Sequence, residues 1–233
     1  MYDTYGCIIR GDTTQRKIAL VFTADEYGAG APFILDALSN YQIKGSFFLT
    51  GNYLRDARNA KAIKRMVAEG HYLGPHSDRH LLYCDWENRD SLLVSREVFD
   101  TDLRANYTQM AKWGIDKSEA LFFMPPYEWY NHRISEWTAE QGGQLVNFTP
   151  GVRTAADYTF PEMGDRYVDS DTLSEQVLTY EEQHPNGLNG FMLLIHVGTD
   201  PRRTDKFYHR LPELIEALTG KGYKFERIDK LFQ

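Results

Sequence analysis

Two adjacent acids, Asp25 and Glu26, come directly after an apolar run and before a glycine-rich turn. The run, residues 18–22, is continuous rather than alternating, which is typical of a strand buried on both faces of a parallel sheet. Loops at the carboxyl ends of such strands carry the chemistry in α/β folds, because the strands form a rigid base beneath them. The acid pair is therefore a candidate site, although a carboxylate here would also serve to cap a following helix.

Two histidines, His76 and His80, stand four residues apart in the segment HSDRH. This spacing predicts that both imidazoles lie on one side of a single helical turn. Two neutral imidazoles and a carboxylate form a three-ligand site for a divalent cation and leave one position open for water. The spacing alone is often incidental. In combination with an acid pair at the same edge of the sheet it favours a metal site.

A third histidine, His196, ends an otherwise apolar run at residues 190–196. Such a histidine either takes part in catalysis or is buried with its ring bonded to a backbone carbonyl, and the sequence leaves both interpretations open. Aromatic side chains lie in or next to the predicted loops, where flat faces suit sugar rings, although core packing is the commoner role of aromatic residues. They are Trp86, Tyr127, Trp129 and Tyr130.

An alternation of strands and helices must position these side chains. Strands are predicted at residues 18–22, 44–50, 71–74, 120–124, 144–148, 190–196 and 223–228. Helices are predicted at residues 32–41, 59–69, 90–113, 131–141, 172–183 and 211–218, and residues 149–171 form a long irregular loop. The pattern indicates an α/β fold, a parallel sheet closed as a barrel in a single domain over residues 1–233. An open doubly wound sheet is the alternative, but the GxGxxG loop usual after its first strand is missing.

The composition excludes several classes of partner. A net charge of -7, from 26 basic and 33 acidic residues, argues against a nucleic-acid surface, which needs a basic patch. No run approaches the roughly 18 apolar residues of a membrane span, and the first residues lack the basic and apolar regions of a signal peptide. Cys7 and Cys84 lie far apart, and their spacing neither supports nor excludes a disulfide. Nothing in the sequence indicates the oligomeric state.

Five short motifs occur in an order that resembles the polysaccharide deacetylases of the NodB-homology type, carbohydrate esterase family 4. They are TADE at 23–26, HSDRH at 76–80, MPPY at 124–127, DY at 157–158 and LLIH at 193–196. The corresponding family motifs read TFDD, H[ST]xxH, RxPY, DxxDW and Lx[IL]H. The resemblance extends over nearly the whole chain and includes the closing GYKFERIDKL. It implies a distorted (β/α)7-type barrel and a metal-dependent hydrolase that removes N- or O-linked acetyl groups from a carbohydrate.

The resemblance also implies a metal site and a base. Asp25 matches the catalytic base, whereas Glu26, His76 and His80 match the three metal ligands. The implied cofactor is a divalent metal, Zn²⁺ above all, with Co²⁺, Ni²⁺ or Mn²⁺ as alternatives that the same donors bind.

Further roles follow from the same resemblance. Tyr127 matches the residue whose backbone N–H binds the oxyanion, and His196 matches the general acid, which Asp157 would hold in its charged form. The implied partner is an acetylated oligo- or polysaccharide. Because such enzymes usually meet their polymers outside the cytoplasm, the resemblance also implies a periplasmic or extracellular location.

Three positions depart from the family pattern. Glu26 stands where aspartate is usual, Tyr158 replaces the tryptophan, and Met124 replaces the arginine that normally holds the catalytic base. Arg79 and Arg153 are candidates for the missing cation. Two alternatives remain open beside the deacetylase. One is a non-catalytic sugar-binding relative, and the other is a hydrolase of small amides or ureides, which would have a narrow closed pocket rather than an open groove.

Overall fold

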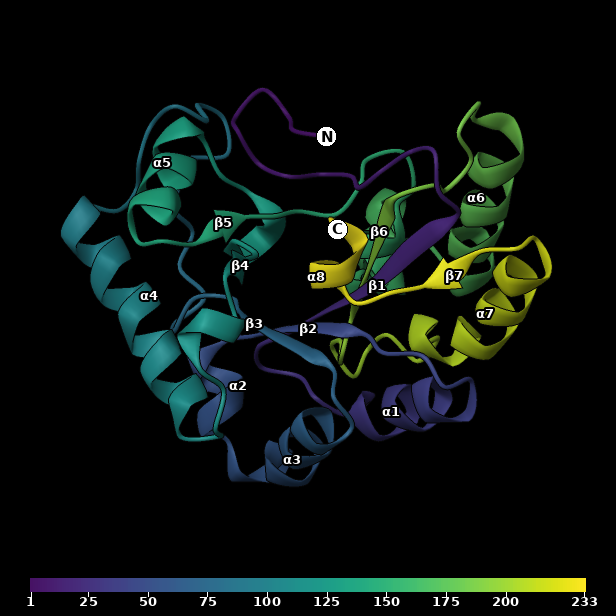
Figure 1. Ribbon diagram of the computed structural model, residues 1–233, viewed down its shortest axis with the longest axis horizontal. Coiled ribbons are helices and arrows are strands. Elements are labelled where there is room, and N and C mark those ends of the chain that lie inside the picture. The colour runs from purple at the N-terminus through teal and green to yellow at the C-terminus, as the bar shows by residue number, and fades with distance from the viewer.

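The computed structural model describes residues 1–233, in which helices lie around the outside of a set of strands (Figure 1). The strands are β1 (Lys17–Ala24), β2 (Ser46–Leu49), β3 (Tyr72–Pro75), β4 (Phe122–Phe123), β5 (Gln144–Leu145), β6 (Phe191–His196) and β7 (Lys224–Phe225). The helices are α1 (Ala31–Asn40), α2 (Gly51–Arg55), α3 (Ala60–Ala68), α4 (Arg96–Ala111), α5 (His132–Glu140), α6 (Ser170–Gln183), α7 (Leu211–Gly220) and α8 (Ile228–Leu231). All seven predicted strands are present, although β4, β5 and β7 are only two residues long.

Strand β1 is the centre of a parallel sheet with the order β3-β2-β1-β6, and β7 pairs with the first two residues of β1. Strands β4 and β5 form a second parallel pair. Single backbone hydrogen bonds join the two sheets. The Met124 N–H donates to the Pro75 carbonyl at 3.2 Å, and the Thr149 N–H donates to the Met192 carbonyl at 3.1 Å. The strands therefore form a closed but distorted barrel, as predicted.

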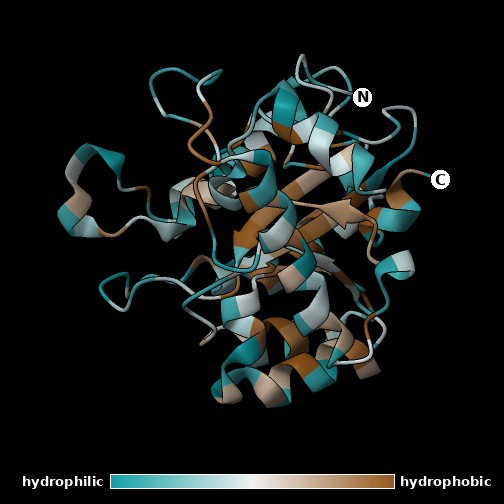
Figure 2. Cartoon of the chain, turned by 90° about the vertical axis from the view of Figure 1, so that its left-hand side faces the viewer, coloured by the Kyte–Doolittle hydropathy of each residue, from teal (hydrophilic) through white to brown (hydrophobic).

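The continuous apolar run of β1 is explained by two separate clusters of buried side chains. Ile18, Leu20 and Phe22 pack in the layer between the sheet and the helices. Ala19 and Val21, which point the other way because side chains alternate along a strand, pack inside the barrel. Figure 2 shows apolar strands at the centre of the molecule, with helices of mixed hydropathy around them. A charged residue at either face of β1 would lack a partner, so the acids come only after the strand ends.

Several boundaries differ from the prediction for local reasons. Helix α4 begins at Arg96, because the Ser95 side chain caps it by accepting a hydrogen bond from the Val98 N–H. The short helix α2 was not predicted, and α8 begins at Ile228, where the last strand was expected to end. The predicted loop at 149–171 contains two 3-10 helices, Thr154–Tyr158 and Pro161–Arg166. None of the helices has the length and apolar character needed to cross a membrane.

The two cysteines, Cys7 and Cys84, are both buried and unpaired. Burial raises the pKa of the Cys84 thiol to about 11, so this side chain behaves as a small apolar group rather than as a nucleophile.

Candidate active site

A cavity of about 440 Å³ lies at the carboxyl ends of the strands. The loops after β1, β3, β4, β5 and β6 all contribute to its lining, because parallel strands end at the same edge of a sheet. The structure thus brings together residues that are far apart in the sequence. The candidate residues that line this cavity are Asp25, Glu26, His76, His80, Tyr127 and His196.

The two histidines lie on an irregular loop and not on the helical turn that their spacing predicts. Ser77 and His80 have left-handed backbones, with φ of 72° and 55°. The buried carboxylate of Asp102 on α4 holds this loop by accepting hydrogen bonds from the Ser77 hydroxyl at 2.6 Å and the Asp78 N–H at 2.9 Å. The centroids of the His76 and His80 rings are 5.1 Å apart. The two imidazoles therefore lie close together as expected, but on an irregular loop that Asp102 of α4 stabilises.

Both imidazoles of this pair are held in the neutral form. His76 Nδ1 lies 2.8 Å from the Met124 carbonyl oxygen, and because a carbonyl only accepts, Nδ1 carries the proton and Nε2 keeps a free lone pair. Burial lowers the pKa of His76 well below its usual value, and the neighbouring His80 adds to this effect. Burial also lowers the pKa of His80, against the opposing charge of Asp25. A neutral imidazole is the form that binds a metal cation.

Asp25 stands beside this pair. One of its oxygens accepts hydrogen bonds from the Thr50 hydroxyl at 2.8 Å and the Asn52 amide at 3.1 Å. The other oxygen lies 3.9 Å from His80 Nδ1. The Thr50 side chain also caps α2 by accepting from the Tyr53 N–H at 3.1 Å, so the unpredicted helix α2 orients the groups that hold Asp25.

The arginine that was expected to replace the family's cation is not found next to Asp25. Arg79 Nε lies 3.7 Å from the Asp102 carboxylate, and its side chain is 60% exposed. Arg153 is exposed on the wall of a neighbouring cavity. Met124 itself is fully buried inside the barrel among apolar side chains. The donors that hold Asp25 are therefore neutral, the Thr50 hydroxyl and the Asn52 amide.

Glu26 is exposed at the mouth of the cavity. In this structure no three histidine, cysteine, aspartate or glutamate side chains are grouped so as to hold one metal ion. The expected set of Glu26, His76 and His80 is thus not assembled, because Asp25 takes the position next to His80 and the following residue is turned outward. The donors nevertheless suit a divalent cation, since two neutral imidazoles and a carboxylate meet at one cavity.

His196 lies across the cavity and has the opposite protonation. Asp157, which is buried, accepts from the His196 backbone N–H at 2.9 Å and from its ring Nδ1 at 2.5 Å. Burial by itself lowers the pKa of His196, but the charge and hydrogen bond of Asp157, together with the charge of Glu128, outweigh burial and raise it to about 9. His196 is therefore an imidazolium at neutral pH and can donate a proton from Nε2.

Aromatic rings form the walls around these groups. Trp86, Tyr127 and Tyr158 are 55%, 45% and 48% exposed. The Tyr127 ring lies 4.5 Å from that of His80, and the Tyr158 ring lies 6.0 Å from that of His196, measured between centroids. Sugar rings bind well to such exposed aromatic faces. Tyr130, which the sequence also suggested, is instead buried in the core.

Two residues of the cavity were missed by sequence analysis. Glu128 lines it from the loop after β4, and Thr23 contributes a buried hydroxyl that has no hydrogen-bond partner in the protein. No spacing or motif marks Glu128, and Thr23 opens the TADE motif at 23–26, where only the two acids were assigned a role. The register that places Thr23 opposite His196 is a property of the paired strands β1 and β6.

The cavity adjoins two others. A neighbouring cavity of about 520 Å³ shares with it Tyr127, Glu128 and Tyr158. Another of about 950 Å³ shares with it Glu26, Tyr27 and Thr199. These three adjoining cavities are together named here the long groove.

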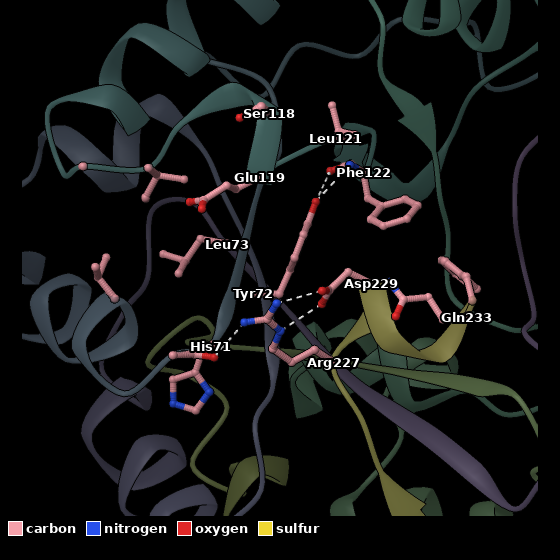
Figure 3. A pocket seen from close by; sticks show the side chains of 15 residues that line it. His71, Tyr72, Leu73, Ser118, Glu119, Leu121, Phe122, Arg227, Asp229 and Gln233 are labelled. Atoms are coloured by element: carbon pink, nitrogen blue, oxygen red, sulfur yellow. Dashed lines mark hydrogen bonds and ion pairs between the residues drawn. The ribbon is translucent and has the colours of Figure 1, made fainter.

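A separate cavity of about 600 Å³ does not offer comparable chemistry (Figure 3). Its central polar side chains, Tyr72, Arg227 and Asp229, are already paired. The Phe122 N–H donates to the Tyr72 hydroxyl at 2.9 Å, and the Arg227 guanidinium binds the Asp229 carboxylate at 2.7 Å. The long groove is therefore the candidate catalytic site.

Known proteins are similar to this chain over most of its length. A family model described as polysaccharide deacetylase matches residues 10–146. The peptidoglycan-N-acetylmuramic acid deacetylase of Bacillus subtilis is 25% identical over 232 residues, which cover 99% of this chain and 77% of that protein. A peptidoglycan-N-acetylglucosamine deacetylase of Bacillus cereus is 24% identical over 219 residues, covering 94% and 89% of the two chains.

Solved structures share the fold. The family 4 carbohydrate esterase PdaA of Bacillus subtilis superposes with a TM-score of 0.72 at 23% identity, covering 97% of this chain and 85% of that one. A pseudoenzyme of the same family from Bacillus anthracis superposes with a TM-score of 0.73 at 18% identity, covering 99% and 70%. Since the fold is common to an esterase and a pseudoenzyme, activity must be argued from the side chains of the site.

Proposed function

The chain belongs to the polysaccharide deacetylase family, and from this premise we propose that it hydrolyses acetyl groups on the amino sugars of a glycan. One observation carries this proposal most directly. A neutral histidine pair with Asp25 lies on one side of the cavity, and the His196 imidazolium with Asp157 lies on the other. Acetyl transfer to water needs both a centre that activates the water and an acid that protonates the leaving group.

The shape of the site favours a polymer over a small amide or ureide. The long groove extends beyond the reactive cavity into the two adjoining cavities, so a chain of sugars has room next to the reacting one. The relatives named above act on peptidoglycan, which is a polymer of this kind. Such glycans lie outside the cytoplasm, and we infer that this chain acts there.

Enzymes of this family are generally metal-dependent. We propose that His76 and His80 hold the divalent cation, with a carboxylate from the Asp25–Glu26 pair. Zinc suits this donor set, and cobalt, nickel or manganese would bind to the same atoms. When bound, such a cation polarises the acetyl carbonyl and makes a nearby water molecule more acidic.

The remaining chemistry is assigned to side chains and backbone of this chain. Asp25, oriented by Thr50 and Asn52, takes the proton of the attacking water through the oxygen that faces His80. The backbone N–H of Tyr127 donates to the oxyanion that forms on the acetyl carbonyl. In this assignment Glu26 completes the ligand set only after its exposed side chain turns inward.

His196 then gives its Nε2 proton to the departing amine nitrogen, and the carbon–nitrogen bond breaks. Asp157 keeps the imidazole oriented and charged before this step. The products are acetate and the free amino sugar.

Acetate release from N-acetylated oligosaccharides tests the proposal, using protein stripped of metal and reloaded with zinc or cobalt, beside an Asp25→Asn control. Metal-dependent release that the control lacks is the expected result. Glycan binding without release would indicate a sugar-binding relative. Release from small amides or ureides alone would indicate the other alternative.

A further inference from the structure

Glu128 has an unusual backbone for its residue type. It follows Tyr127, and both have left-handed conformations, with φ of 53° and 58°. Residues with a Cβ are disfavoured there by roughly 1–2 kcal/mol each, and such strain persists mainly where the surrounding structure imposes it. The Asn147 amide donates to the Glu128 carbonyl at 3.0 Å and helps to hold this conformation. The strain is thus associated with one fixed direction of the Glu128 side chain.

That direction is into the long groove. Glu128 lines both the reactive cavity and the neighbouring 520 Å³ cavity, so it stands at the junction where the reacting sugar would meet the next one. Its carboxylate makes no hydrogen bond or ion pair within the protein, whereas its backbone does. A half-buried carboxylate with free acceptors at such a junction is available to a bound ligand.

The charges around Glu128 are of both signs, and the acids lie on the side of the reactive cavity. Asp25, Glu26 and Asp200 line that cavity, whose lining includes no lysine or arginine, and Asp200 is paired with Arg202 at 2.6 Å. Arg89 and Arg153 line the neighbouring cavity. Burial raises the pKa of Glu128 to about 7, an effect that the positive charge of His196 opposes and the charge of Asp157 reinforces. A cationic group on a ligand beside Glu128 would pair with its free carboxylate, and an anionic group would be repelled by it.

We propose that Glu128 determines the charge selectivity of the long groove, favouring a glycan with an ammonium group on the sugar next to the reacting one and disfavouring a carboxylate at that position. The inference rests on the proposed function, because it takes the groove to bind a glycan. It makes partially deacetylated amino-sugar polymers the preferred substrate class. Glycans whose sugars carry acidic substituents would be poor substrates.

The test compares Glu128→Gln with Glu162→Gln, an exposed glutamate that does not line the cavity and gives the same change in net charge. Three oligosaccharides of equal length are titrated by calorimetry at a pH of about 7. One is fully N-acetylated and neutral, one contains an unacetylated amino sugar, and one contains a carboxylated sugar. Acetate release is measured on the same samples.

We expect the wild-type protein to bind the cationic glycan about tenfold more tightly than the anionic one, and added salt to reduce this ratio. Glu128→Gln should reduce the ratio by about five- to tenfold and change the affinity for the neutral glycan by less than about twofold. Glu162→Gln should keep the wild-type ratio. Glu128→Gly, which removes the backbone strain as well, should reduce the ratio of the two affinities to the same extent.

An unchanged ratio in both Glu128 variants would overturn the proposal, and so would a wild-type protein that binds none of the three glycans. The proposed function is judged separately. If the ratio depends on Glu128 but no acetate is released, the selectivity stands and the deacetylase assignment fails. If acetate is released but the affinity ratio does not depend on Glu128, the deacetylase assignment stands and the charge selectivity fails.

Discussion

Asp157 and His196, which are 39 residues apart in the chain, are joined through both carboxylate oxygens of the aspartate. One oxygen accepts the backbone N–H of His196 and the other accepts its ring Nδ1–H. The first bond fixes the end of β6 relative to the loop that carries Asp157, and the second fixes the tautomer and the ring. His196 therefore presents Nε2 to the cavity as a positioned proton donor.

Replacing Asp157 with Asn should shift the pH dependence of turnover. The pKa of His196 is raised from 6.5 to about 9 in the folded protein. Burial lowers this pKa, and the Asp157 carboxylate is the main group that raises it. Without Asp157 the imidazolium loses its proton at lower pH, so the basic limb of the kcat profile should move down by at least one pH unit and kcat should fall by about 10–100-fold.

The same raised pKa affects stability. A folded pKa above the unfolded one means that the His196–Asp157 pair stabilises the fold fully below a pH of about 6.5 and loses this contribution as the pH rises through about 9. The free energies of unfolding of wild type and Asp157→Asn, measured in urea, should therefore differ most near a pH of about 6.5 and least near about 9. Asp165→Asn, at an exposed aspartate, is the control, and an equal pH dependence in all three proteins would contradict the assignment.

The two acids after β1 should differ in their effects. Asp25→Asn should lower turnover by at least about 100-fold, because Asp25 faces His80 and is the proposed base, and the protein should still bind cobalt. Glu26→Gln should weaken metal binding by at least about tenfold, because the proposed function assigns the carboxylate of Glu26 to the metal once its exposed side chain turns inward. Metal content and cobalt absorption spectra measure both effects. Loss of cobalt in Asp25→Asn alone would make Asp25 the ligand and leave Glu26 outside the site.

Asp102 should be needed for metal binding although it is not a candidate ligand. Asp102→Ala leaves the Ser77 hydroxyl and the Asp78 N–H buried without an acceptor, which should cost about 2–4 kcal/mol of unfolding free energy and loosen the loop that holds the two histidines. Asp102→Asn keeps one acceptor and should be milder. Asp100→Asn on the same helix breaks only a partly exposed pair with Arg96 and is the control. Unchanged cobalt affinity in a folded Asp102→Ala protein would refute the role.

Restoring the family's arginine should not improve this chain. Met124 is fully buried among apolar side chains inside the barrel, so Met124→Arg would place a charge there and should lower the unfolding free energy by at least about 2 kcal/mol. Met124→Leu, which conserves volume, should cost less than about 1.5 kcal/mol. Denaturant titration and acetate release follow both variants. A stable Met124→Arg protein with raised turnover would show that the arginine reaches Asp25 after all.

Much of the fold was predictable because its signals are local. The continuous apolar run of β1, the helical spacing of Ile34, Leu35 and Leu38, and the turn residues between elements all follow from nearest neighbours in the chain. The boundaries of α4 and the short helix α2 were less accessible, since they depend on the caps Ser95 and Thr50, which are visible only once the backbone is known.

For the site, the sequence by itself determined which residue types stand at the ends of the strands, and the order of the motifs that indicates the family. Only the tertiary structure decided how they meet. It gave His76 and His80 a loop held by Asp102 instead of a helical turn, turned Asp25 rather than Glu26 toward His80, and brought Glu128 into the groove. These outcomes depend on contacts between segments far apart in the chain, and such contacts leave no periodic pattern in the sequence around any one of the residues involved.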